Sequence, residues 1–181
     1  EGFCFYNNIS IAAKYLQNKG FKKILIVDWD YHHGDGTEHF FYDDPSVLFF
    51  STHDWNAYPG TGDPSRRGAG NGNGFNINVH LPCGSNSLDI ENAFLNYLKP
   101  KALNFAPDFV LISAGFDSRK NDLLGCFSID DYGYRNITKI TSEIANLSAG
   151  GRIISILEGG YNPSGVASSV SAHIEELILT I

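Results

Sequence analysis

The sequence contains no methionine, only three cysteines and no run of basic residues. Cys4, Cys83 and Cys126 form no C-x-x-C pair and their number is odd. This pattern predicts no disulfide framework and favours a reducing compartment, the cytoplasm or, in a eukaryote, the nucleus. No apolar run approaches the ~18 residues that a membrane-spanning helix needs, and no signal segment is visible, so we expect no membrane partner. A chain without methionine that begins Glu1-Gly2 is expected to be part of a longer protein.

The charge balance is acidic. Thirteen basic residues oppose 20 acidic ones, which gives a formal net charge of −7. Binding to a phosphate backbone requires the opposite balance, so we expect no direct contact with nucleic acid, whereas a cationic substrate would be attracted. The 181 residues, 43% of them hydrophobic, are enough for one domain, residues 1–181.

Short apolar segments alternate with segments of helical periodicity. Strands are predicted within KKILIVDWD, SVLFFST, FNINVHL, FVLISAGFD and RIISILEGGYN. The first, fourth and fifth of these read as strands buried on both faces, which is typical of parallel sheets. Helices are predicted over residues 8–19, over 89–105 with a break or kink at Pro100, from Ser128 to about Leu147, and over 166–179. Ser128 and Asp131 have capping-box spacing, and Gly20 is placed to end the first helix. We therefore predict an α/β domain with a mainly parallel sheet covered by helices on both faces.

Three of the predicted strands end in polar residues. ILIV is followed by DWDYHHGDG, FVLISAG by FDSRKND and IISIL by EGGYN. Because ligands of such sheets bind beyond the carboxyl ends of the strands, these three groups should face one crevice.

The residues in this crevice predict a catalytic metal site. Asp30 and His32 can point at one centre, and Asp117 arrives from a second strand. One imidazole and two carboxylates leave a coordination position open, and Zn²⁺ fits this set best, although Fe²⁺, Co²⁺ and Mn²⁺ also accept it. Asp28 and Asp35 are then expected to orient histidines from the outer shell.

Structural explanations of the same residues stay open. A single Asp at a strand end is often a helix cap, and D-G is ordinary turn chemistry, but so dense a cluster of acids and histidines favours the metal. His33 is either a hydrogen-bonded core histidine or a functional one. Tyr161, after two glycines, is either an oxyanion donor or a half-buried turn residue.

The motifs also resemble a known family. GFCFYNN, VDWDYHHGDGTE, YPGTGD, FVLISAGFDSRKNDLLG and LEGGYN occur in the order found in zinc-dependent histone deacetylases. The resemblance is to the class II and bacterial acetylpolyamine amidohydrolase-like branch. It implies a three-layer arginase–deacetylase fold, here the C-terminal part of the catalytic domain without its first strands. It also implies hydrolysis of an N-acetyl amide, either acetyl-lysine in a protein or an acetylated polyamine, to acetate and a free amine.

The resemblance assigns a role to each matching position. Asp30, His32 and Asp117 match zinc ligands, Tyr161 the tyrosine that stabilises the transition state, and Asp28 and Asp35 the buried acids that partner a catalytic histidine pair. The channel for the acyl-lysine side chain matches Gly2, Phe3, Tyr58, Gly159 and Gly160. A structural K⁺ is implied beside Asp28, Asp30, His32, Ser51 and Thr52.

One element of the family pattern is missing from the sequence. The tandem histidines that act as general base and acid precede the GFC motif, before the first residue of this chain. The 181 residues by themselves are therefore expected to be inactive. Two other functions remain open: a manganese ureohydrolase of the same fold class, and a non-catalytic acyl-lysine-binding or scaffold domain. The oligomeric state is not predicted.

Overall fold

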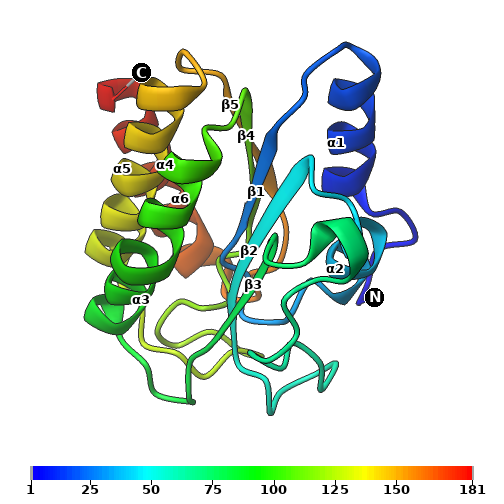
Figure 1. Ribbon diagram of the computed structural model, residues 1–181. Coiled ribbons are helices and arrows are strands. Elements are labelled where there is room, and N and C mark those ends of the chain that lie inside the picture. The colour runs from blue at the N-terminus through cyan, green and yellow to red at the C-terminus, as the bar shows by residue number, and fades with distance from the viewer. Residues whose placement is uncertain (1, 181) are drawn as a thin grey trace.

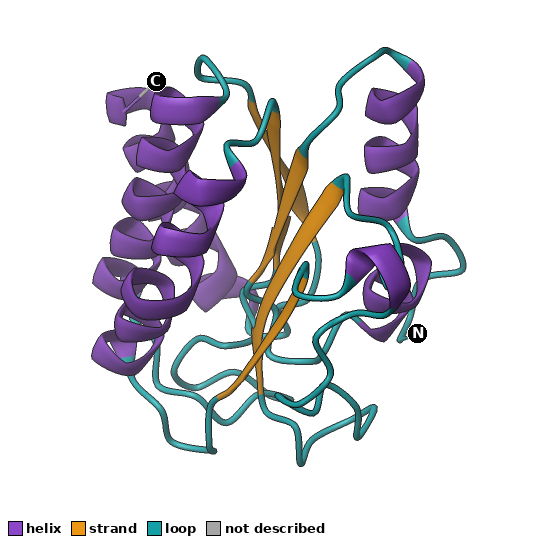
Figure 2. Cartoon of the chain, viewed as in Figure 1, coloured by secondary structure: helices purple, strands orange, loops and turns teal. Residues whose placement is uncertain are grey.

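The structure, a computed structural model, describes residues 2–180. It is built around a five-stranded parallel sheet in the order β3-β2-β1-β4-β5. Helices lie on both sides of this sheet (Figures 1 and 2). The strands are β1 (Ile24–Asp28), β2 (Val47–His53), β3 (Asn76–His80), β4 (Phe109–Ala114) and β5 (Ile153–Leu157). The predicted α/β class with a mainly parallel sheet is confirmed.

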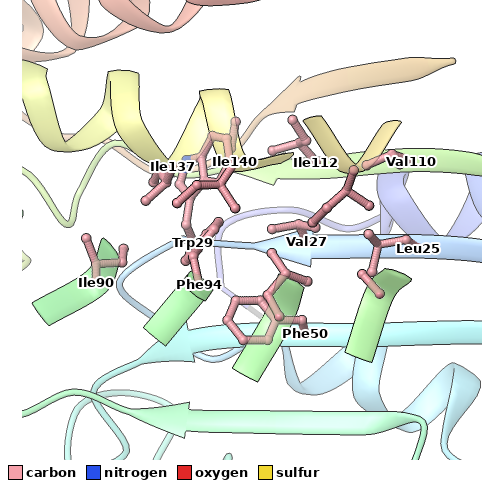
Figure 3. Close-up of a cluster of buried hydrophobic side chains, with 14 of the residues drawn as sticks. Leu25, Val27, Trp29, Phe50, Ile90, Phe94, Val110, Ile112, Ile137 and Ile140 are labelled. Carbon is pink, nitrogen blue, oxygen red and sulfur yellow. The ribbon is translucent and has the colours of Figure 1, made fainter. Parts of the chain in front are cut away.

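Alternation along the central strands divides the core into two layers. Leu25, Val27 and Phe50 point to one face of the sheet and pack with Phe94 and Ile137 from the helices there (Figure 3). The intervening side chains form a second cluster on the other face, together with residues of α1 (Asn8–Asn18) and α2 (Asp35–Phe41). Because both faces of β1, β2 and β4 are covered, each of these strands begins with four apolar residues in a row.

The remaining helices lie together on one side of the sheet, opposite α1 and α2 (Figure 1). They are α3 (Ser87–Ala93), α4 (Lys99–Phe105), α5 (Asp131–Ser148) and α6 (Pro163–Thr180). A π-helical turn, Phe94–Leu98, separates α3 from α4, with Pro100 in the first turn of α4. The helix predicted over residues 89–105 is thus interrupted by a π-turn just before Pro100, and Pro100 itself lies in the first turn of α4 without breaking the chain of helical turns. No helix among residues 2–180 is both long enough and apolar enough to cross a membrane.

Two sequence predictions about these elements are wrong, and one helix was not predicted. The cap of α5 is Asp130, whose side chain accepts a hydrogen bond from the backbone N–H of Gly133, so Ser128 and Asp131 form no capping box. The residues after β1 continue into the short helix α2, which their turn-like composition did not predict. Finally, β5 is an edge strand whose side chains are half-buried or exposed, although its sequence resembles a fully buried strand.

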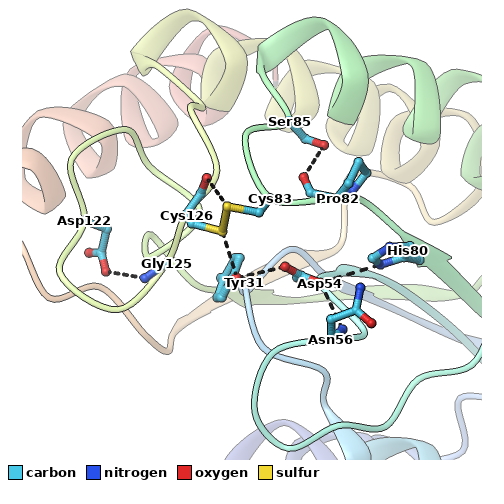
Figure 4. Close-up of a disulfide and its surroundings, with 10 residues drawn as sticks. All are labelled: Tyr31, Asp54, Asn56, His80, Pro82, Cys83, Ser85, Asp122, Gly125 and Cys126. Atoms are coloured by element: carbon cyan, nitrogen blue, oxygen red, sulfur yellow. Dashed lines mark hydrogen bonds and ion pairs between the residues drawn. A yellow bond between two sulfur atoms is a disulfide. The ribbon is translucent and has the colours of Figure 1, made fainter.

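The cysteines also differ from expectation. Cys83, after β3, and Cys126 form a disulfide across 43 residues, with the Cα atoms 5.2 Å apart (Figure 4). Cys4 is free and exposed. The prediction of no disulfide is therefore wrong, because the two cysteines come together only through the tertiary fold and their spacing carries no local signature.

Candidate active site

Three neighbouring strands deliver their polar residues to one place. Asp30 and His32 follow β1, and Asp117 follows β4, the strand beside it. Nδ1 of His32 lies 2.8 Å from Oδ2 of Asp117 and 3.2 Å from Oδ1 of Asp30. One ligand atom from each of the three residues lies within 4.8 Å of the others. The structure therefore brings together the triad that the sequence predicted.

Backbone N–H groups hold both carboxylates in position. The N–H of Tyr31 donates to Oδ1 of Asp117 at 2.8 Å, and the N–H of Gly159 donates to Oδ2 of Asp30 at 2.9 Å. Asp28, at the end of β1, accepts from the N–H of Asp30 at 3.0 Å. The triad is thus fixed by rigid strand ends, and not by side-chain packing alone.

Two glycines make room for the carboxylates. A Cβ atom on Gly159 would lie 2.5 Å from Oδ2 of Asp117 and 2.6 Å from Oδ2 of Asp30. A Cβ on Gly115 would lie 2.3 Å from Oδ2 of Asp30. Any side chain at either position would displace the acids. The sequence suggested Gly159 only as a channel residue. The structure shows in addition that it leaves space for the carboxylates of the triad.

Burial and the charge of a neighbouring acid raise the pKa values of Asp117 and Asp28. Burial raises the pKa of Asp117 above its ordinary value, and the nearby charge of Asp30 adds to the effect. Burial likewise raises the pKa of Asp28, again with a contribution from Asp30. Burial by itself would lower the pKa of His32, but hydrogen bonds to Asp117 and Asp30 outweigh it and raise the pKa to about 10. A site of this kind favours a positive charge at its centre.

The donor set fits a divalent metal. Two ligand atoms of a tetrahedral zinc site are about 3.4 Å apart, given bonds near 2.1 Å. The distance from Nδ1 of His32 to Asp30, 3.2 Å, is close to this value, whereas the 2.8 Å distance to Asp117 is that of a hydrogen bond and would have to lengthen around a metal. Three protein ligands leave the fourth position for a water or a substrate oxygen, as in catalytic sites. A metal would have to displace the proton of His32, so its binding depends on pH.

Aromatic side chains lie near the triad. The ring centroid of Tyr58 lies 6.4 Å from that of His32, and the ring of Tyr161 meets Phe3 edge to face at 5.9 Å. Phe3 is 82% exposed and Tyr58 58% exposed, as expected of residues at the mouth of a site. Gly2, the other predicted channel residue at the N-terminus, is exposed and has a positive φ of 95°. Tyr58 thus lies beside a predicted ligand and Phe3 beside Tyr161, while the channel role of these residues and of Gly2 stays a prediction.

The predicted outer acids are not equivalent. Asp28 is 3% exposed, in agreement with its expected role as a buried acid. Asp35 is half-buried, because it begins α2 and borders an open cavity of about 600 Å³. Among the described residues its burial is thus incomplete, and its expected role as a partner of a histidine pair stays a prediction. Ser51 and Thr52 of β2 are fully buried, and the hydroxyl of Ser51 is hydrogen-bonded to Nδ1 of His53 at 2.8 Å. A potassium ion at this place stays a prediction.

A second buried group of polar side chains surrounds Glu38, and the sequence did not predict it. Glu38 of α2 is 4% exposed and accepts hydrogen bonds from Arg66, Asn76 and Asn78 at 2.6, 2.9 and 2.6 Å. Nε2 of His33 lies 3.5 Å from the same carboxylate. Arg66, Asn76 and Asn78 are 28 to 40 residues from Glu38 in the sequence. No local motif therefore predicts these contacts. The alternative of a hydrogen-bonded core histidine is the one that the structure supports for His33, since its Nδ1 also contacts the hydroxyl of Thr61 at 2.8 Å.

Comparison with known proteins identifies the family. Residues 1–177 match the family model described as the histone deacetylase domain. The chain belongs to the histone deacetylase family. Histone deacetylase 15 of Arabidopsis thaliana is 42% identical over 181 residues, which cover 98% of this chain and 32% of that protein. A probable deacetylase of Archaeoglobus fulgidus is 40% identical over 91% of this chain and 46% of its own length.

Solved structures agree with this family assignment. The crystal structure of the HDA15 HD domain superposes with a TM-score of 0.94 at 42% identity, and covers 99% of this chain and 51% of that one. The structure of the histone deacetylase Clr3 gives a TM-score of 0.90 at 35% identity over 97% of this chain and 30% of that one. The neighbours confirm the arginase–deacetylase type of α/β fold. The chain spans about a third to a half of the length of the curated relatives named above.

Proposed function

We propose that the site performs metal-dependent hydrolysis of an N-acetyl amide, with Zn²⁺ held by Asp30, His32 and Asp117. The observation that carries the proposal is the convergence of these ligands from the ends of β1 and β4, beside the exposed ring of Tyr58. Membership of the histone deacetylase family supports deacetylation in general. The substrate is an acetylated lysine side chain or an acetylated polyamine, both of which carry the scissile amide at the end of a slender chain.

The chain's own residues divide the work. A zinc ion at the triad supplies Lewis-acid polarisation of a carbonyl oxygen. Burial of Tyr161, helped by the charges of Asp117 and Asp30, raises the pKa of its phenol to about 12. The phenol therefore stays protonated at neutral pH and can donate a hydrogen bond to the oxygen on which negative charge develops. Phe3 and Tyr58 bind the chain that leads to the amide.

A general base is the part of the chemistry that these residues do not supply. Within residues 2–180, only His32 among the histidines contacts the triad carboxylates, and it is a ligand. Nδ1 of His33 is hydrogen-bonded to the hydroxyl of Thr61, and its Nε2 lies 3.5 Å from the carboxylate of Glu38. General acid–base catalysis typically contributes ~10²–10⁴-fold to the rate. We therefore propose that the 181 residues alone turn over substrate at least about 100-fold more slowly than a longer natural polypeptide that includes them.

The test combines metal analysis with two substrates. The 181-residue chain and the longer polypeptide are purified and loaded with zinc, and acetate release is followed with an acetyl-lysine peptide and with an acetylated polyamine. We expect one zinc per chain and turnover of one substrate class by the longer protein. In that protein, Tyr161→Phe should lower kcat by ~10²–10³-fold without changing the zinc content. Tight substrate binding without acetate release would support a binding domain instead, and two manganese ions per chain would support a ureohydrolase.

A further inference from the structure

The position of Tyr161 depends on an acid from another loop. Oδ2 of Asp122 accepts a hydrogen bond from the backbone N–H of Tyr161 at 2.7 Å. Next to it, the side-chain amide of Asn162 donates to the carbonyl of Asn121 at 3.0 Å. Residues 161 and 162, which lead from β5 into α6, are thereby attached to the loop that follows β4.

The side chain of Tyr161 has little else to orient it. Within residues 2–180, its hydroxyl has no hydrogen-bond partner, and its described ring contact is with Phe3, which is 82% exposed. Such a neighbour is a weak support, because an exposed side chain is free to move. The location of the phenol therefore depends on the backbone of Tyr161, and Asp122 accepts the hydrogen bond of that backbone N–H.

Asp122 is itself tied to the metal ligand of the same loop. Its Oδ1 accepts from the N–H groups of Leu124 and Gly125 at 2.9 and 3.1 Å; Figure 4 shows the bond to Gly125. Gly125 in turn approaches Asp117 so closely that a Cβ atom on it would lie 1.9 Å from the carbonyl oxygen of Asp117. The carboxylate thus connects the backbone of Tyr161 to the loop segment that packs against Asp117.

We propose that Asp122 is a positioning residue, which sets the phenol of Tyr161 at the correct distance from the metal triad. This inference rests on the proposed function and adds a residue to it. Asp122 touches no reacting atom, since its oxygens are occupied by three backbone N–H groups. Oδ1 accepts from the N–H groups of Leu124 and Gly125, and Oδ2 accepts from that of Tyr161. An asparagine could not replace both acceptors, because an amide has one oxygen.

The chemistry predicts an effect on kcat and not on substrate binding. A donor that acts on charge present only in the transition state affects kcat when it is misplaced, and a displacement of 1 Å can cost ~10²-fold. In the longer natural polypeptide, Asp122→Ala and the isosteric Asp122→Asn should therefore lower kcat by about 10–100-fold, with KM within about threefold and zinc content unchanged.

A double-mutant cycle gives the decisive measurement. If Asp122 acts through the phenol, Asp122→Ala should cost less than about threefold in a Tyr161→Phe background, where there is no hydroxyl left to place. Asp108→Ala is the matched control, because that carboxylate also accepts two backbone N–H groups, those of Lys22 and Lys23, away from the triad. The control should retain kcat within about twofold.

The outcomes separate this inference from the proposed function. Equal losses from Asp122→Ala in both backgrounds, or a loss of zinc, would overturn the positioning role and leave the deacetylase proposal intact. If Asp122→Ala does not fold, the cycle with Asp122→Asn decides in the same way. A full-activity Tyr161→Phe variant would likewise overturn the positioning role, because there would be no catalytic phenol to place. The deacetylase proposal itself would fail only if the wild-type protein, loaded with zinc, released no acetate. An independent readout is the affinity for a trifluoromethyl ketone analogue of the acetyl group, whose hydrate mimics the tetrahedral state. It should weaken by a similar factor in the Asp122 and Tyr161 variants, but not in the control.

Discussion

Nδ1 of His32 lies 2.8 Å from Oδ2 of Asp117, although 85 residues separate the two in the sequence. The contact exists because β1 and β4 are parallel neighbours in register, Asp28 opposite Ser113, so that the residues following each strand emerge together. Everything proposed for this protein depends on that adjacency, since neither strand alone carries enough ligands for a metal.

The first prediction concerns the ligands themselves. Asp117→Asn should weaken zinc binding at least ~100-fold, because even outer-shell partners of metal ligands contribute 10–100-fold. Competition with a chromogenic chelator measures the affinity. Asp44→Asn makes the same change of charge at a carboxylate that is bound by Ser46 and Gln17, outside the triad, and should leave the affinity unchanged. Equal affinities of the Asp117 variant and the wild type would show that the triad is no metal site.

The second prediction uses the space around Gly159. In Gly159→Ala, the new methyl group must push apart the carboxylates of Asp117 and Asp30, which a Cβ would approach to 2.5 and 2.6 Å. Zinc affinity should fall about 10–100-fold, the range for disturbed outer-shell support. The matched variant Gly165→Ala meets the flexible side chain of Arg119 and should bind zinc normally. If both variants bind zinc equally well, the carboxylates are less confined than the structure indicates.

The parts of the site that the sequence predicted share one property. Asp30, His32 and Asp117 directly follow apolar strands, and the rule that parallel strands present their carboxyl ends to one crevice places them without further information. The apolar runs also predicted β1, β2 and β4, because strands covered on both faces lose the polar alternation that would otherwise obscure them.

The features that the sequence did not predict depend on long-range packing. The exposure of β5 follows from its position at the edge of the sheet, and its composition is that of an interior strand. Glu38 resembles a surface residue of an amphipathic helix until Asn76 and Asn78 of β3 are placed against it. Likewise, Asp122 stands in a loop rich in polar residues, and only the fold shows that it meets Tyr161.

The third prediction concerns the cysteines. Under denaturing conditions without reductant, alkylation should modify Cys4 alone, and after reduction all three cysteines. Mass spectrometry distinguishes the two patterns. In the chain-entropy description, a cross-link over 43 residues stabilises a fold by up to about 4 kcal/mol, so reduction should lower the melting temperature. Cys126→Ser should be destabilised likewise and respond no further to reductant. Three reactive thiols before reduction would contradict the disulfide.

The last prediction concerns acid stability and follows from Glu38. Burial by itself would raise the pKa of Glu38, but contacts with His33, Asn78 and Arg66 outweigh it and lower the pKa from 4.5 to about 2. A carboxyl whose pKa is lower in the folded state contributes stability above its unfolded pKa. That contribution is lost as the pH falls from about 4.5 towards 2.

Glu38→Gln should therefore lower the free energy of unfolding at pH 7 by about 1–3 kcal/mol, the usual cost of unsatisfying buried hydrogen-bond partners. The difference from the wild type should shrink at pH 3, where the wild-type advantage is partly lost. Urea unfolding at both pH values measures it. Glu175→Gln removes an exposed carboxylate paired with Arg135 and should cost less than about 1 kcal/mol at either pH. A difference between Glu38→Gln and wild type that is the same at pH 7 and pH 3 would mean that the network is stabilised by shape and hydrogen bonding alone, and that the charge of Glu38 contributes nothing to it.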